Sequence, residues 1–178
     1  MERKKPKLKK RYILLCLLLV VVLAVAILQI FDNSPIRFRY KDLLYGEEVK
    51  EFFLENEEAF EYVVSCLRKT SHTGQYLRVG ITKRTKEVVF SDYYRKTLFA
   101  DDIGISVDER LTECIRTIVI EGKLGALKAT KYPSMFLMTF GNDYHTDRFP
   151  TRIWYYDDPH NPSYMKGYAH IKGNWYYR

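Results

Sequence analysis

The strongest pattern in the chain is an uncharged apolar run close to the N-terminus. Residues 12–31 form a stretch of twenty that is rich in leucine, isoleucine and valine, and Gln29 is its one strongly polar side chain. A helix of that length rises about 30 Å, which matches the hydrocarbon core of a bilayer. A core helix of a soluble domain would show a polar face, and this run has none. The pattern therefore predicts a transmembrane helix.

The charges on either side of the run predict its orientation. Residues 1–11 hold seven basic side chains and one acid, whereas residues 32–35 hold no base. The excess of positive charge favours a cytoplasmic N-terminus. We therefore expect a single-pass protein of the cell membrane, with a basic cytoplasmic tail (1–11), a short linker (32–35) and an extracytoplasmic domain (36–178).

A cleaved signal peptide is the alternative, because Ala24-Val25-Ala26 fits a small-x-small cleavage site. The apolar run continues beyond that site through Ile27, Leu28, Ile30 and Phe31. This continuation favours a retained signal-anchor.

Helical periodicity predicts two helices in the domain. The first covers about 47–69. Asn56, near the middle of its apolar stripe, either caps a second helix that starts at Glu57 and Glu58 or is a buried polar residue with a partner, and we favour a break or kink there. The second begins at a capping box in which Ser106 is the N-cap and Glu109 reaches back, and it ends at Gly122.

The rest of the domain reads as strands joined by local turns. The expected strands are 75–82, 87–90, 124–132, 134–141, 152–156 and 168–177. Hairpin connections imply an antiparallel sheet. The fold class is therefore α+β, an antiparallel sheet of about 5–6 strands covered on one face by two helices.

Composition narrows the function. The formal charge of the whole chain is +7, but without residues 1–11 the count is 22 bases against 21 acids, which leaves +1. A near-neutral domain predicts no nucleic-acid partner. No phosphate loop, Ser-His-Asp order, zinc spacing or nucleotide fingerprint occurs, so we expect no cofactor and no metal.

Two sets of side chains are candidate sites. Asp143, His145 and Asp147 alternate along the chain and His160 follows, so an extended segment would gather them into a metal or acid–base site. Turn formation explains the same residues. Cys66 and Cys114 lie in the two predicted helices, where they would form either a disulfide or two buried thiols.

The aromatic residues are the most distinctive feature. Trp154-Tyr155-Tyr156 recurs as Trp175-Tyr176-Tyr177. If both strands pair, rings alternate on each face of the sheet. Exposed rings at Trp154, Tyr156, Trp175 and Tyr177 would stack on sugars or bind peptide, whereas buried ones would be ordinary core.

The basic tail, the apolar anchor, the Tyr-rich α+β domain and the Gly173-Asn174-Trp175-Tyr176-Tyr177 ending resemble uncharacterised exported, membrane-anchored proteins of Gram-positive, Clostridia-like bacteria. The resemblance implies a location in the cell envelope and no activity.

These observations favour a binding module over an enzyme. The expected partners of the outer domain are an envelope protein, a peptide or a cell-wall glycan, in addition to the membrane itself. The alternative is a membrane-tethered hydrolase, with or without a metal, that uses Asp143, His145, Asp147 and His160.

Overall fold

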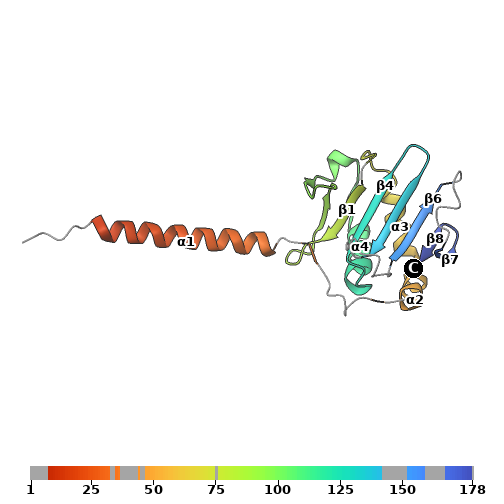
Figure 1. Cartoon of the computed structure of the whole chain (residues 1–178), viewed down its shortest axis with the longest axis horizontal. Helices are drawn as coiled ribbons and strands as arrows, with labels where there is room; N and C mark the ends of the chain where they lie inside the picture. The colour runs from red at the N-terminus through yellow and green to blue at the C-terminus, as the bar shows by residue number, and fades with distance from the viewer. Residues whose placement is uncertain are drawn as a thin grey trace, which may run out of the picture. The chain divides into compact units, whose positions relative to one another are not determined.

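The chain divides into two compact units, residues 1–34 and 35–178, in the computed structural model (Figure 1). The structure describes residues 8–32, 35–36, 44, 47–74, 76–141, 152–158 and 167–177. The first unit consists of one described helix, α1 (Leu8–Asp32). Its segment Tyr12–Gln29 has a mean hydropathy of 3.0. The helix is long and apolar enough to cross a membrane, and a signal sequence shares both properties.

The first predicted helix of the domain is two helices, α2 (Glu47–Glu55) and α3 (Glu57–Leu67). The break falls at Asn56, as the sequence predicts. Asn56 does not cap α3 with its side chain. Its Nδ2 instead donates to the carbonyl oxygen of Phe52 over 2.9 Å and satisfies a terminal acceptor of α2.

The next helix, α4 (Glu109–Arg116), continues as a π-helical segment, η3 (Thr117–Glu121). The predicted N-cap at Ser106 is wrong by two residues: Asp108 is the cap, and its Oδ1 accepts from the backbone N–H of Leu111 over 2.6 Å. The predicted stop at Gly122 is confirmed. Glycine is favoured there because a Cβ would lie 2.7 Å from the backbone carbonyl oxygen of Ile118 and 2.4 Å from Cε1 of Phe52.

The sheet is antiparallel and has eight strands in the order β3-β2-β1-β4-β5-β6-β8-β7, which is more than the predicted 5–6. The short strand β3 was missed, and the single strand expected over 168–177 is a hairpin, β7–β8, whose turn places Gly173 at φ +51°. The bounds are β1 (Tyr76–Ile81), β2 (Val88–Ser91), β3 (Thr97–Leu98), β4 (Ala126–Lys131), β5 (Phe136–Gly141), β6 (Arg152–Asp157), β7 (Ala169–Lys172) and β8 (Trp175–Tyr177).

The strand register collects the sheet's core residues on one face. Residues directly opposite each other in an antiparallel pair share a face. Two core rows therefore run across the strands, and all of the residues in them are buried. The rows are Val79, Leu127, Phe140 and Ile153, and Leu77, Ala129, Met138, Tyr155 and Trp175.

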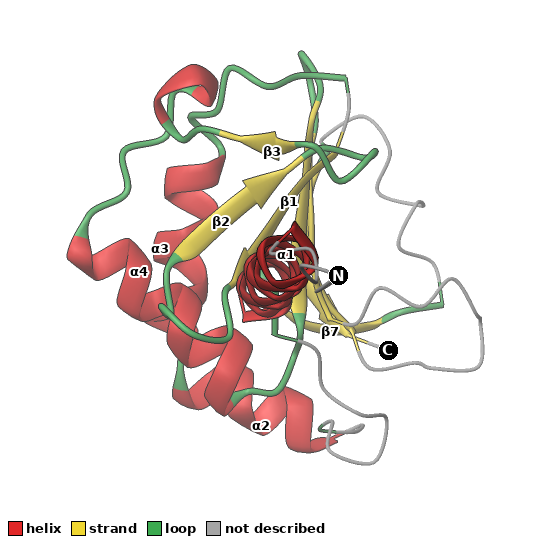
Figure 2. Cartoon of the chain, turned by 90° about the vertical axis from the view of Figure 1, so that its left-hand side faces the viewer, coloured by secondary structure: helices red, strands yellow, loops and turns green. Residues whose placement is uncertain are grey.

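Figure 2 shows α2, α3 and α4 on one side of the sheet. Aromatic rings make the contact between the helices and this core face. Phe60 of α3 lies 4.9 Å from Phe140 and 5.8 Å from Trp175 between ring centroids, and Phe53 of α2 lies 4.7 Å from Trp175. Trp175 Nε1 also donates to Glu61 Oε1 over 2.6 Å, so the indole satisfies its polar atom at the same contact.

This packing predicts that Phe60→Ala lowers the free energy of unfolding by about 3–5 kcal/mol, because a fully buried ring is replaced by a cavity. Leu54→Ala on the neighbouring helix is the matched control. Leu54 is 47% exposed, so the expected change is within about 0.5 kcal/mol. Urea denaturation of both variants measures the difference, and equal losses would contradict the assigned core.

Candidate functional site

The face of the sheet opposite the core carries a continuous row of polar and aromatic side chains. The pairing registers place one residue from each of seven neighbouring strands in this row, in the sheet order β2-β1-β4-β5-β6-β8-β7. The row spans about 29 Å at the usual strand spacing. Most of its members are half-buried and His170 at the edge is exposed. We call this set the cross-strand row: Ser91, Arg78, Lys128, Thr139, Trp154, Tyr176 and His170.

The cross-strand row combines cations with flat rings. Lys128 Nζ lies 5.4 Å from the ring centroid of Tyr76, and the Trp154 ring lies 5.3 Å from that of Tyr168. The His170 ring lies 5.2 Å from that of Tyr176. Planar apolar rings next to polar groups are the side chains that bind sugars and peptides at low entropic cost. The arrangement is suited to binding.

Trp154 is the most informative member of the row. Its indole Nε1 is shielded from solvent and has no hydrogen-bond partner among the described residues. A buried N–H without an acceptor is costly, so an acceptor at this position would be favourable.

A shallow depression of about 580 Å³ lies at the β4–β5 turn. Leu137 and Thr130 in its wall are paired across β4 and β5 and share the face of the cross-strand row. Tyr132, which is 41% exposed, adds a ring, and Asp158 adds a carboxylate that accepts from Tyr156 Oη over 3.1 Å. The depression therefore extends the face with the same mixture of rings and polar groups.

The four aromatic residues predicted as a binding set are divided between the two faces. Trp154 and Tyr156 lie on the face of the cross-strand row, where Trp154 is half-buried and Tyr156 is 4% exposed. Trp175 is 1% exposed and belongs to the core. Tyr177 lies on the core side, where its Oη donates to Glu47 Oε1 of α2 over 2.5 Å. Of the four, only Trp154 is both partly exposed and a member of the cross-strand row.

The predicted Asp143, His145, Asp147 and His160 cluster lies outside the described residues. Its described neighbours have ordinary roles: Asp157 forms an ion pair with Arg68, and Asp158 accepts from Tyr156. Among the described residues, no group of three or more His, Cys, Asp or Glu side chains could hold a metal ion.

Cys66 and Cys114 are half-buried, and both are free thiols in the structure. Burial raises the pKa of the Cys114 thiol. Both thiols pack against the hydrophobic core as small apolar groups.

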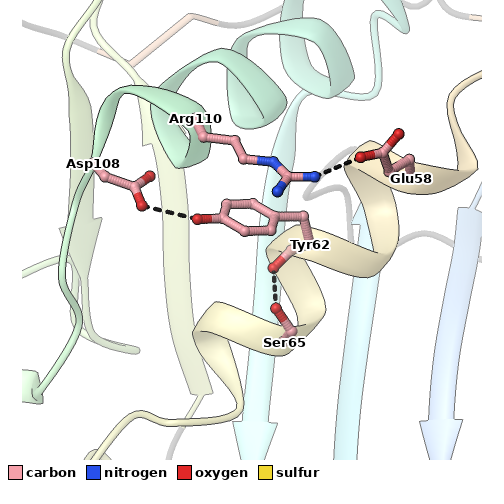
Figure 3. Close-up of polar contacts among 5 residues, drawn as sticks. All are labelled: Glu58, Tyr62, Ser65, Asp108 and Arg110. Atoms are coloured by element: carbon pink, nitrogen blue, oxygen red, sulfur yellow. Dashed lines mark hydrogen bonds and ion pairs between the residues drawn. The ribbon is translucent and has the colours of Figure 1, made fainter.

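A polar network joins α3 to the start of α4 (Figure 3). The guanidinium of Arg110 lies 4.2 Å from the ring centroid of Tyr62, and Tyr62 Oη donates to Asp108 Oδ2 over 2.8 Å. Arg110 also pairs with Glu58 over 2.5 Å. Donation to Asp108 raises the pKa of Tyr62 to about 12. The Leu111 N–H and the Tyr62 hydroxyl hold the pKa of Asp108 below its ordinary value of 3.8. These contacts position the helices.

Sequence reasoning missed the members of the row outside the two aromatic triplets, and also Tyr76, which contacts one of them. Lys128 and Tyr76 are adjacent only because β1 pairs with β4, some fifty residues later in the chain. Tyr176 was in the recurring triplet, but its face depends on the β6–β8 register. The one available signal was the alternation of apolar and polar residues within each strand, which separates the two faces of that strand.

No protein-family model, curated protein or solved structure matches the chain.

The α3–α4 network predicts a pH dependence. Because the folded-state pKa of Asp108 is lowered, its ionised form stabilises the fold above the ordinary pKa of 3.8, and this contribution is lost as pH falls through the lower folded value. Asp108→Asn keeps an N-cap acceptor but removes the charge. We expect the variant to melt at a lower temperature than wild type at pH 7, with the gap closing toward pH 2. A gap that stays constant across thermal melts from pH 7 to 2 would contradict this assignment.

Proposed function

We propose that the chain is a single-pass protein of the cell membrane, anchored by α1 with its N-terminus in the cytoplasm. Residues 36–178 act as an extracytoplasmic binding module for an envelope protein, a peptide or a cell-wall glycan. The apolar length of α1 and the seven bases that precede its uncharged segment support this topology. α1 thereby holds the module close to its ligands.

The cross-strand row is the observation that supports the binding role. In our proposal the helices cover one face of the sheet and leave the opposite face to the ligand. The core side chains of the strands share the first face, as the register requires. The second face offers rings and cations in a line about 29 Å long, which suits an extended ligand.

Trp154 and Tyr176 are directly opposite each other on β6 and β8, and both are half-buried. We assign them the central contact. A ring of the ligand would cover their exposed surface. Lys128 would add a charged contact farther along the row.

The two tryptophans of the chain give a direct test, because Trp154 is on the proposed ligand face and Trp175 is in the core. In full-length Trp175→Phe protein in detergent, Trp154 is the sole indole. We expect its fluorescence to change as soluble peptidoglycan fragments, or a library of unstructured peptides, are titrated. Tyr176→Ala in the same background should weaken the apparent affinity about fivefold or more, as truncation of an interface aromatic does.

The matched control is Trp154→Phe, in which Trp175 is the sole indole and should not respond. Near-UV circular dichroism verifies that both variants are folded. A response from Trp175 alone, or a silent Trp154 with both classes of ligand, would overturn the proposed binding face.

A further inference from the structure

The β1–β2 turn presents a cluster of exposed cations at one end of the sheet. Lys83, Arg84 and Lys86 are exposed and flank Thr85. Glu87 is the one acid of the turn, so three cations less one carboxylate leave a charge of +2 on residues 82–87.

Thr82 fixes the shape of this turn. Its side chain is 4% exposed, and its Oγ1 accepts from the Glu87 N–H over 3.2 Å and lies 2.6 Å from Thr85 Oγ1. Thr85 in turn donates to Glu87 Oε2 over 3.0 Å. The turn also places a lysine, Lys86, at φ +58°, where glycine is favoured. The cations therefore project from an ordered backbone.

The same turn is joined to the start of the domain. Pro35 forms a β-bridge with Thr82, and the Ile36 N–H donates to the Ile81 carbonyl oxygen over 2.8 Å. α1 ends at Asp32, so only two residues separate it from Pro35. Three Cα–Cα steps span at most about 11 Å, whatever the orientation of the helix.

We propose that the β1–β2 turn binds anionic lipid headgroups of the membrane that α1 spans. This inference rests on the proposed membrane anchor and is independent of the ligand of the cross-strand row. Basic groups near a membrane surface are attracted to anionic lipids over roughly a Debye length, which is comparable to the covalent reach from α1. The contact would select one end of the sheet to face the lipid.

The chain contains its own control at the other end of β1 and β2. Ser91, which ends β2, pairs with Arg78 near the start of β1, whereas Val88 pairs with Ile81 at its end. The turn after β2 also carries two exposed cations, Arg95 and Lys96, and Arg95 has φ +64°. This second turn, residues 92–96, carries a charge of +1, two cations less the carboxylate of Asp92, and lacks the link to Pro35.

The test is hydrogen–deuterium exchange of the full-length protein in nanodiscs of phosphatidylcholine with and without phosphatidylglycerol. Alkaline extraction and an intact mass first verify that α1 is retained in the membrane; its absence would overturn both the anchor and this inference. With α1 retained, we expect amides of residues 83–87 to exchange about fivefold more slowly in anionic discs, and 0.5 M salt to abolish the difference. Amides of residues 92–96 should exchange equally in both discs.

Two variants separate this contact from general adsorption. Lys83→Ser/Arg84→Ser/Lys86→Gly should remove the dependence on lipid composition, measured as the ratio of rates between discs within the variant. Arg95→Gly/Lys96→Ser should keep it. Equal rates at residues 83–87 in both wild-type discs, or equal protection of both turns, would overturn the lipid contact and leave the ligand of the cross-strand row unaffected.

Discussion

The contact of Phe53 and Phe60 with Phe140 and Trp175 is the interaction on which the rest of the domain depends. It joins two helices to strands β5 and β8, which are distant in sequence from those helices. Trp175 can occupy this position because Glu61 accepts its indole N–H, so burial of the ring leaves no unsatisfied donor. The contact places one face of the sheet in the core, and the opposite face carries the polar and aromatic side chains of the cross-strand row.

The two Trp-Tyr-Tyr triplets show the consequence. β6 and β8 pair with Tyr155 opposite Trp175 and Trp154 opposite Tyr176. The same three letters therefore lie in opposite phase: the central tyrosine of the first triplet is in the core, and the central tyrosine of the second lies in the cross-strand row. Because side chains alternate along a strand, a one-residue change of register would exchange the two sets of rings. Which rings lie on the face opposite the core thus follows from register.

The antiparallel order also gives the two ends of the sheet different surroundings. The β1–β2 turn lies at one end of the sheet and is joined to Pro35 through Thr82. The β4–β5 turn and its depression lie at the other end, next to the start of β1. A ligand in the depression and a lipid contact at the other end would therefore not compete for the same surface. The direction of β1 thus separates the end joined to Pro35 from the end that carries the depression.

Local patterns in the sequence determined the apolar helix, the α+β class, the break at Asn56 and the stop at Gly122, because each depends on periodicity or on a residue within a few positions. The cap at Asp108 rather than Ser106 combines a local bond from the Leu111 N–H with a tertiary one, since Tyr62 of another helix donates to the same carboxylate. Tertiary structure decided the rest, including the short strand β3 and the separate strands β7 and β8, which exist through pairing with neighbours. Tertiary structure also decided which of the two tryptophans is buried. The sequence of a strand shows that its side chains alternate between the two faces of the sheet. It does not show which set faces the core, because that depends on the register with the neighbouring strands.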